Sequence, residues 1–371
     1  MKTYKNLYEQ LISEENVEIA IHNALKGKCK KKRKARKYQE LKNKDKSILI
    51  PEIIDYAKNF KHFEHIKVHI HDGVRQKERD IIVPSLKEEV LHHMLINVLK
   101  PIFMKPLYEH SYGSIPGRGA HTAKKFISRW VKNDVKNTKY VLKMDIRKYF
   151  DSIPHNILKE GLSKIIKDKR FLDILFEVID TTEVGIALGF YTSQWLANYY
   201  LTGLDHYIKQ ELGVVYYVRY VDDMVILGPN KKKLHKIKDL ISIYLKENLG
   251  LNMKRNWQVF KLAYKNKEGK YHGRDLDFMG FRFYRDKVTL RKSILKKIMR
   301  RVHRMDKKRK SRKPWTIHDV RVFLSYYGWI KSTQTHDKYY KEIVPFISIK
   351  SLKKIISSFD KKTKEVKKLC C

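Results

Sequence analysis

The chain of 371 residues is long enough for two or three sub-domains. Since 42% of its residues are hydrophobic and 12% are aromatic, it can also bury a sizeable core. Its 81 Lys and Arg against 40 Asp and Glu leave a net charge of +41, which favours a polyanionic partner such as nucleic acid. A membrane surface is the weaker alternative, since no basic amphipathic helix stands out and no apolar run approaches the ~20 residues of a membrane span.

Cysteines and targeting signals point to a cytoplasmic protein. Cys29, Cys370 and Cys371 provide neither a disulfide framework nor the spacing of a zinc site. The segment that begins at Met1 leads into no signal-peptide core. We therefore expect a reducing compartment and no membrane partner.

Residues 1–44 are predicted to form a basic helical extension. Residues 1–25 carry a loosely amphipathic set of apolar side chains. Residues 26–37 are a dense run of Lys and Arg, which the sequence allows to be either a solvated linker or an arm that follows phosphates. This run and residues 361–371 are expected to be the least ordered parts of the chain.

Residues 45–138 are predicted to hold a strand at 66–70, two cations, Lys77 and Arg79, just before a β-rich stretch closed by Pro84, and a long helix. Ser85 and Glu88 have the spacing of a capping box at the start of that helix, and Pro101 is expected to end it. A glycine-rich loop follows at 111–119 with Arg118 embedded in it, and such loops let backbone amides approach phosphates. This signal is weak by itself, because glycine-rich loops are common.

A carboxylate is predicted at the end of a buried strand over residues 138–146. Asp145 lies on the opposite face from Leu142 and Met144. A charge in such a place needs a partner, and a metal ion shared with other acids would supply one. Asp151 is the competing candidate, although its context suits a turn or a helix cap.

Two predicted helices, 156–166 and 170–181, lead to an apolar, glycine-bearing loop at 185–191. A single long helix is then expected over 193–212. Its large apolar side chains, Trp195, Leu196, Tyr199, Tyr200, Leu204 and Ile208, have core periodicity rather than that of a stacking platform.

Residues 216–228 are predicted to form a β-hairpin around the adjacent acids Asp222 and Asp223, because runs of Val, Ile and Tyr flank them. Two neighbouring carboxylates repel each other unless a cation lies between them. A hard, oxygen-binding ion such as Mg²⁺ is the natural occupant. An isolated Asp-Asp pair is more often a solvated turn, so the rest of the chain has to decide.

The last third is expected to hold a helix over 231–249, a short strand at 251–254 that brings Lys254 near the acids, and basic helices from residue 293 onward. Residues 276–283 and 287–290 are predicted to pair as a second hairpin that turns near 285–286. The basic helices include Lys307, Lys308 and Arg309, and we expect such a surface to contact a nucleic-acid duplex.

Asp145, Asp222 and Asp223, with Lys and Arg around them, fit phosphoryl transfer assisted by two Mg²⁺ ions, for which Mn²⁺ is a possible substitute. At these residues the sequence resembles a reverse transcriptase. Residues 220–223 are similar to the Tyr-x-Asp-Asp box of that family, and Asp145 is similar to the acid of its first palm motif. Residues 77–84, 111–119, 276–281 and 323–331 are similar to further segments of bacterial, intron-type members.

The resemblance implies an α+β right-hand fold in four segments: the extension (1–44), fingers (45–138), palm (139–292) and a basic helical thumb with its tail (293–371). It implies a nucleotidyltransferase, an RNA-directed DNA polymerase that is encoded by a bacterium or phage. Its expected partners are dNTPs, an RNA template with its primer, and an RNA–DNA duplex. The implied residues fall into three groups: metal ligands Asp145, Ile146, Asp222 and Asp223; dNTP contacts Lys77, Arg79, Phe150, Leu188, Gly189 and Lys254; and nucleic-acid contacts Arg118, Ser193, Gln194, Tyr220, Gly280, Lys307, Lys308 and Arg309.

Two positions refine that expectation. Phe150 falls where the family places an aromatic gate against the ribose 2′-hydroxyl, with a core phenylalanine as the alternative. Leu188-Gly189 and Ser193-Gln194 stand where most members have Gln-Gly and Ser-Pro, which is similar to the error-prone enzymes of diversity-generating retroelements. Leu188 cannot donate the hydrogen bond that glutamine would, so discrimination at the nascent base pair should weaken. The chain departs from that group in having Leu for the usual Ile, and Phe190 where Asn is frequent.

Three hypotheses follow. The first is a diversity-generating reverse transcriptase, which the resemblance pairs with a small basic accessory protein and a structured retroelement RNA. The second is the same chemistry in an antiphage-defence, retron-like or intron-derived setting. The third is a non-catalytic RNA-binding scaffold, against which the three acids argue because a scaffold has no use for them.

Overall fold

The computed structural model of the chain describes residues 2–26, 35–72, 77–335, 340–341 and 343–369. Most of the basic run at 26–37 and all three cysteines lie outside these residues. The chain divides into two compact units, residues 1–119 with 140–259 and residues 120–139 with 260–371. These boundaries differ from the four segments expected from the sequence, which stay predictions.

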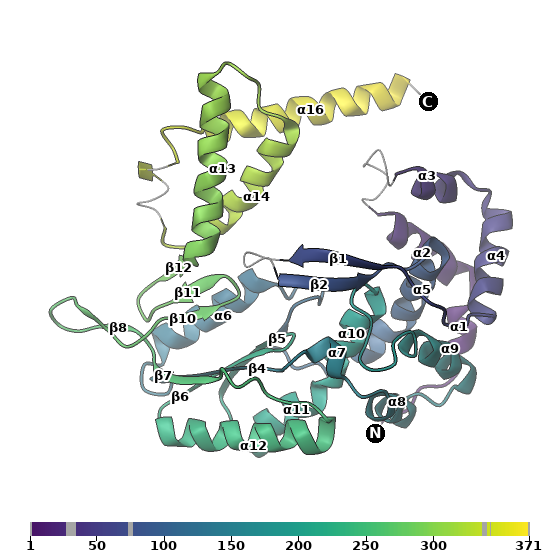
Figure 1. Cartoon of the computed structure of the whole chain (residues 1–371), viewed down its shortest axis with the longest axis horizontal. Helices are drawn as coiled ribbons and strands as arrows, with labels where there is room; N and C mark the ends of the chain where they lie inside the picture. The colour runs from purple at the N-terminus through teal and green to yellow at the C-terminus, as the bar shows by residue number, and fades with distance from the viewer. Residues whose placement is uncertain (1, 27–34, 73–76, 336–339, 342, 370–371) are drawn as a thin grey trace. The chain divides into compact units, whose positions relative to one another are not determined.

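The first unit contains a five-stranded sheet (Figure 1). Its order is β3-β5-β6-β4-β7, formed by β3 (Ser111–Tyr112), β5 (Tyr216–Tyr220), β6 (Asp223–Gly228), β4 (Tyr140–Asp145) and β7 (Gln258–Lys261). β6 pairs antiparallel with both β5 and β4, whereas β3 runs parallel to β5. The predicted hairpin over 216–228 is thereby confirmed. Helix α12 (Lys231–Leu249) packs against β4 and β6.

Helices form the rest of the first unit, with α5 (Leu86–Phe103) at their centre. Four of them pack on α5: α1 (Leu7–Leu11), α2 (Glu14–Leu25), α4 (Lys46–Lys58) and α10 (Tyr191–Tyr200). Further helices of this unit are α3 (Ala35–Asn43), α7 (Tyr149–Ser152), α8 (His155–Ile165) and α9 (Lys169–Ile179). Strands β1 (Lys67–Asp72) and β2 (Lys77–Ile82) make a separate antiparallel ribbon.

The capping box at the start of α5 is confirmed, since the Ser85 side chain accepts from the Glu88 amide and the Glu88 side chain accepts from the Ser85 amide. The prediction that Pro101 ends this helix is wrong. The helix continues to Phe103, and the Met104 amide donates to the Lys100 carbonyl at 3.0 Å. The final turn persists past the proline because Phe103 is buried in the core.

The single helix expected over 193–212 is also wrong. The chain forms α10, then α11 (Thr202–His206), then a π-helical turn at Tyr207–Glu211. The Thr202 hydroxyl donates to the Tyr199 carbonyl at 2.7 Å, and such a side-chain bond competes with the helical amide at the break. The expected core side chains Trp195, Leu196, Tyr200, Leu204 and Ile208 are buried, and Tyr199 is half-buried.

The second unit combines a small sheet with basic helices. Its helices are α6 (Ala120–Asn133), α13 (Lys292–Lys310), α14 (Ile317–Lys331) and α16 (Ile349–Leu369). β8 (Tyr264–Lys265) pairs with β9 (Tyr271–His272), and a separate meander contains β10 (Leu276–Phe278), β11 (Phe281–Phe283) and β12 (Val288–Leu290). The expected hairpin that turns near 285–286 is confirmed by the pairing of β11 with β12. The prediction of one continuous strand over 276–283 is wrong, because Met279 and Gly280 both have positive φ (50° and 86°) and form a tight turn between β10 and β11.

The architecture is α+β, as expected. No helix in the described part of the chain is long and apolar enough to cross a membrane.

Candidate active site

The turn between β5 and β6 consists of Val221 and Asp222, so Asp223 is already the first residue of β6. Val221 has a φ of +57°. A β-branched residue rarely adopts this left-handed conformation, which costs on the order of 1–3 kcal/mol and persists only where the surroundings enforce it. The Val221 amide donates to the Tyr112 carbonyl at 3.0 Å, and a Cβ on Gly113 would lie only 2.7 Å from Val221 Cγ2. The turn is therefore held tightly from the β3 side.

Three carboxylates meet at this turn. Asp145, the last residue of β4, is paired in register with Asp223, so the two side chains lie on the same face of the sheet. Burial, together with the negative charges of Asp145 and then Asp223, raises the pKa of Asp222 from 3.8 to about 7. A buried carboxyl group that ionises reluctantly beside other negative charges marks a site that a cation would stabilise.

Lys254 is the cation that the chain itself brings to the acids. Its ammonium group pairs with Asp145 Oδ2, and its amide donates to the Asp145 carbonyl at 2.8 Å. The Arg147 amide donates to Asn252 O at 2.8 Å, so residues 252–254 run beside the end of β4. The expected position of Lys254 near the acids is confirmed, although one β-bridge, from Ile146 to Met253, replaces the expected strand.

The other oxygen of Asp145 indicates whether a metal would fit. Asp145 Oδ1 is buried and has no hydrogen-bond partner. An ionised carboxylate oxygen in that state favours a bound cation, and paired carboxylates suit Mg²⁺. Within residues that the structure describes, no group of three His, Cys, Asp or Glu side chains is arranged as a complete metal-binding cluster. Asp145 and Asp222 thus fit as the carboxylates that would hold the ion, and a ligand role for Asp223 or for the buried Ile146 stays a prediction.

The loop before α10 connects two parts of the predicted dNTP site. The Ile186 amide donates to the Phe150 carbonyl at 2.8 Å, and the Ile82 amide of β2 donates to the Leu188 carbonyl at 2.7 Å. Gly189 has a φ of +116°, and a Cβ there would lie 2.2 Å from the Ile82 carbonyl oxygen. Only glycine allows so close an approach. Phe150, Leu188 and Gly189 are therefore brought together with the end of β2.

β2 carries the two cations predicted to contact the triphosphate. Arg79 is exposed and pairs in register with Ile70. Lys77 begins the strand, and its side chain lies outside the described part of the structure. Their dNTP contacts stay predictions.

Three of the predicted nucleic-acid residues of the first unit, Arg118, Gln194 and Tyr220, lie in the glycine-rich loop or against it. Arg118 Nη1 donates to the Tyr108 carbonyl at 2.8 Å, so its guanidinium closes the glycine-rich loop. The Ser114 hydroxyl donates to Gln194 Oε1 at 2.8 Å, Ser193 is buried, and Tyr220 is half-buried beside Gly113.

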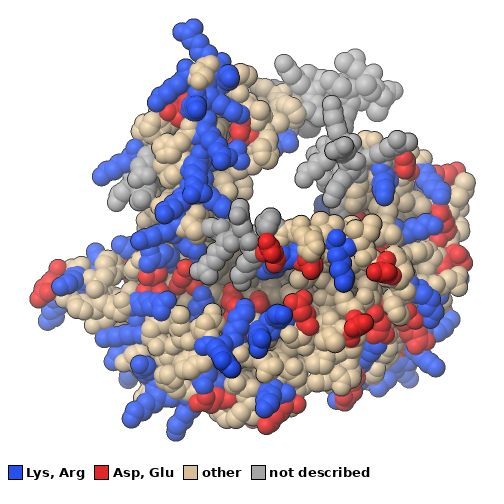
Figure 2. Space-filling view, in the orientation of Figure 1, with Lys and Arg blue, Asp and Glu red and all other residues tan. Residues whose placement is uncertain are grey.

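In the second unit, Lys and Arg gather over α13, as Figure 2 shows. Lys308 pairs with Asp319 at 2.5 Å and Arg309 pairs with Asp306 at 2.7 Å, whereas Lys307 is exposed. Gly280 is buried with a φ of +86°, and a Cβ there would lie 2.7 Å from Ile294 Cδ1. Nucleic-acid contacts by these residues stay predictions.

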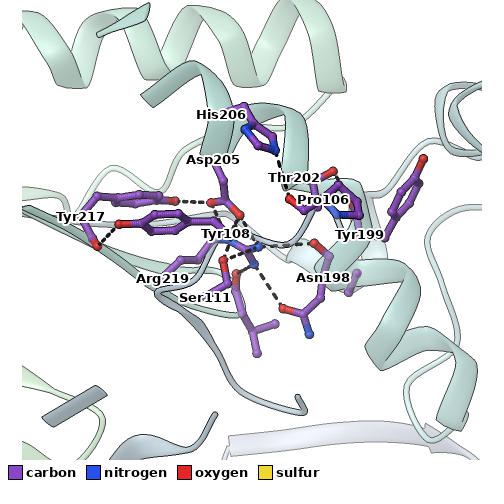
Figure 3. Close-up of polar contacts among 12 residues, drawn as sticks. Pro106, Tyr108, Ser111, Asn198, Tyr199, Thr202, Asp205, His206, Tyr217 and Arg219 are labelled. Carbon is purple, nitrogen blue, oxygen red and sulfur yellow. Dashed lines mark hydrogen bonds and ion pairs between the residues drawn. The ribbon is translucent and has the colours of Figure 1, made fainter. Parts of the chain in front are cut away.

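A buried ion pair behind the turn was missed from the sequence. Arg219 and Asp205 are both 0% exposed and bond at 2.6 Å (Figure 3). The Tyr217 hydroxyl donates to Asp205 Oδ1 at 2.7 Å, and burial with the nearby negative charge of Asp205 raises the pKa of Tyr217. The sequence pattern that could have indicated it is an arginine within an apolar strand. A buried arginine needs an acidic partner inside the fold.

A second buried cluster was also missed. His65 Nε2 lies 2.8 Å from Glu88 Oε2, and Phe190 lies against the rings of both His65 and His92. Burial, together with the charges of neighbouring histidines, lowers the pKa of His92 to about 3. The cluster anchors the end of the loop that carries Leu188.

Comparison with known proteins identifies one family. Residues 68–283 match "Reverse transcriptase (RNA-dependent DNA polymerase)". A putative COX1/OXI3 intron 2 protein of Saccharomyces cerevisiae is 24% identical over 270 residues, which cover 55% of this chain and 30% of that protein. The Retron Ec73 reverse transcriptase of Escherichia coli is 25% identical over 199 residues, which cover 50% and 60% of the two chains. The telomerase of Candida albicans, solved with a fragment of telomeric RNA, aligns with a TM-score of 0.46 at 13% identity over 66% of this chain and 51% of that one.

The chain covers only part of the length of these relatives. The chain spans 30% of the yeast intron protein and 38% of Protein YkfC of Escherichia coli, to which it is 25% identical over 146 residues, or 36% of this chain.

Proposed function

The chain belongs to the reverse transcriptase family, and from this premise we propose that it is an RNA-directed DNA polymerase that extends a primer with dNTPs on an RNA template. The observation that carries the proposal is the convergence of Asp145, Asp222 and Asp223 on one tight turn, where the pKa of Asp222 is raised to about 7. A solvated turn would produce no such shift, because water would screen the charges.

The carboxylates of Asp145 and Asp222 would hold a divalent cation, Mg²⁺ or as a substitute Mn²⁺, with Asp223 beside them. When bound, the ion would lower the pKa of a primer 3′-hydroxyl and stabilise the charge on the leaving pyrophosphate. Lys254 neutralises Asp145 in the free protein and would be available to the triphosphate once Asp145 binds the cation. Asp222 has to lose its proton before it can serve as a ligand.

The nucleotide would lie between Phe150 and the end of β2, because the loop carrying Leu188 is hydrogen-bonded to both. Arg79 and Lys77 would contact the triphosphate from β2. The ring of Phe150 would exclude a 2′-hydroxyl by its bulk, which selects dNTPs over ribonucleotides. Phe150 is half-buried, so part of its surface is open to such a contact. The centroid of its ring lies 5.6 Å from that of Tyr149.

Error-prone copying of template adenines, as in diversity-generating retroelements, is the finer form of this proposal. It rests on Leu188, whose side chain offers no hydrogen bond while its carbonyl is bound to Ile82. A structured RNA and a small basic accessory protein would be its partners. The likeness to the retron enzyme favours the second candidate, a retron-like, intron-derived or defence-related enzyme. A template and variable repeat pair beside the gene would support the first setting, and an isolated defence island would support the second.

The central test is dNTP incorporation on a primed RNA template by the full chain and by Asp222→Ala, with RNA binding measured in parallel. We expect Asp222→Ala to abolish incorporation while RNA affinity falls little, because one acid contributes little to phosphate binding. Asp151→Ala, which removes an exposed acid nearby, is the matched control and should retain activity.

Incorporation by Asp222→Ala at the wild-type rate would refute the catalytic role of the turn. Loss of incorporation and RNA binding together would indicate a folding role for the acid. RNA binding without incorporation by the wild-type chain would favour the scaffold hypothesis. Sequenced cDNA from the enzyme and its co-purifying RNA would identify the template.

A further inference from the structure

A fully buried arginine lies two residues before the strained turn. Arg219 is the penultimate residue of β5, and burying a guanidinium is costly unless acceptors satisfy its donors. Asp205 of α11 supplies two of them, since Arg219 Nε donates to Oδ1 at 2.8 Å and Nη2 donates to Oδ2 at 2.6 Å (Figure 3). This bidentate pair fixes the plane of the guanidinium.

The remaining donors of Arg219 reach three other segments. Nη1 donates to the Val221 carbonyl at 2.9 Å and to Asn198 Oδ1 of α10 at 3.3 Å. Nη2 donates to the Ser111 hydroxyl of β3 at 3.2 Å, and that hydroxyl donates to Asp205 Oδ2 at 3.0 Å. One guanidinium therefore connects α10, α11 and β3 to the turn.

Val221 is the residue that this network controls. It has a positive φ, and its two backbone polar groups are both bound, the amide to Tyr112 and the carbonyl to Arg219. The next residue along the chain is Asp222. Fixing the Val221 peptide thus fixes the direction in which the Asp222 carboxylate leaves the turn.

We propose that Arg219, held by Asp205, is a positioning residue of the active site. Its guanidinium holds the Val221 carbonyl and so fixes the backbone from which the Asp222 carboxylate interacts with Asp145. The inference rests on the proposed polymerase function for its effect on turnover, but its effect on cation binding is independent of that function. A pair that served only to stabilise the core would be replaceable by a neutral, well-packed one, whereas a positioning role requires the bond to Val221.

The experiment compares four variants with the wild-type chain: Arg219→Lys, Arg219→Met, Asp205→Asn/Arg219→Met and Tyr200→Phe. Arg219→Met leaves Asp205 buried without its cation, so we expect a lower melting temperature. The double variant removes both charges, and asparagine at 205 can still serve the hydroxyls of Tyr217 and Ser111. Its melting temperature should therefore recover most of the loss.

Activity should not recover with stability. We expect kcat for dNTP incorporation to fall about 10- to 100-fold in Arg219→Met and in the double variant, because a displaced catalytic group costs rates of that order. The dNTP KM should stay within about threefold, since Arg219 does not contact the nucleotide. Arg219→Lys should be intermediate, because an ammonium lacks the fork that spans Asp205 and Val221.

A second measurement does not depend on turnover. Mn²⁺ binding to each variant without nucleic acid, followed by electron paramagnetic resonance, should weaken in Arg219→Met and in the double variant. Tyr200→Phe removes another buried hydrogen bond of the same unit, from Tyr200 Oη to the Leu249 carbonyl at 2.7 Å. This control should lower the melting temperature without changing kcat or Mn²⁺ affinity.

Recovery of both kcat and melting temperature in the double variant would overturn the proposal and leave the pair a structural one. If the wild-type chain incorporates no dNTP, the proposed function fails, and Mn²⁺ affinity then decides the positioning role alone. Weaker Mn²⁺ binding in the stable double variant supports that role, and unchanged binding refutes it.

Discussion

Replacing Asp222 with asparagine is expected to stabilise the protein at alkaline pH while it removes activity. Burial, and then the negative charges of Asp145 and Asp223, raise the pKa of Asp222 from 3.8 to about 7. In the unfolded chain the same group ionises near 3.8, so the native state binds the extra proton between about pH 4 and pH 7. The contribution of Asp222 to the stability of the metal-free protein therefore falls as the pH rises through this window, and its whole cost is present above pH 7.

The magnitude follows from the two pKa values. A difference of about 3 corresponds to about 4 kcal/mol of unfolding free energy, at roughly 1.4 kcal/mol for each tenfold change in proton affinity. Part of this cost is already present at pH 5, where the unfolded carboxyl is largely ionised. We therefore expect the advantage of Asp222→Asn over the wild type to grow by about 2–3 kcal/mol between pH 5 and pH 8.

Urea unfolding at the two pH values, with EDTA present and circular dichroism as the signal, measures this difference. Asp151→Asn neutralises an exposed acid on α7 and should show no such growth. Adding Mg²⁺ at pH 8 should stabilise the wild type more than Asp222→Asn, since the ion binds the ionised carboxylate of the native state. Equal advantages of Asp222→Asn at pH 5 and pH 8 would show that the carboxylates do not interact as described.

Three further predictions concern the nucleotide side of the site. Gly189→Ala should destabilise the protein by about 2 kcal/mol or more and lower kcat/KM for dNTPs, because its Cβ would lie 2.2 Å from the Ile82 carbonyl oxygen at a φ of +116°. Urea unfolding measures the stability and steady-state kinetics measures kcat/KM, and a variant as stable as the wild type would contradict the contact. If the ring of Phe150 is the gate, Phe150→Val should leave dNTP incorporation largely intact and raise ribonucleotide incorporation about tenfold or more. Competition between dNTPs and rNTPs measures the ratio of the two incorporation rates, and an unchanged ratio would favour a core role for the ring. Leu188→Gln should reduce misincorporation opposite template adenine, which sequencing of cDNA from both enzymes tests; unchanged adenine error rates would remove the case for error-prone copying.

Local sequence patterns predicted most elements of the site correctly. The hairpin over 216–228, the strand that ends at Asp145 and the capping box at Ser85 all follow from rules that act within a few residues. The failures were local patterns that packing or a side chain overrode. Phe103 keeps α5 helical past Pro101, and the Thr202 hydroxyl interrupts the helix that begins at α10.

Lys254 was expected near the acids, but the ion pair between Asp205 and Arg219 could not be predicted in the same way. Asp205 meets Arg219 only because α11 lies behind β5. A sequence shows that a buried arginine needs an acid, but 40 acids are candidates and only the packing of elements selects one. The pKa of Asp222 depends in the same way on how deeply it is buried and on which charges lie beside it.

The sequence by itself determined that two adjacent acids lie where a hairpin turns into its second strand and that a third ends a neighbouring strand, because alternation and turn chemistry are short-range. Only the tertiary structure decided that Val221 is strained, that Arg219 holds its carbonyl, and that Asp222 is reluctant to ionise. Those properties arise from distances between segments that are remote in the chain, and electrostatic and hydrogen-bond energies depend on such distances rather than on residue order.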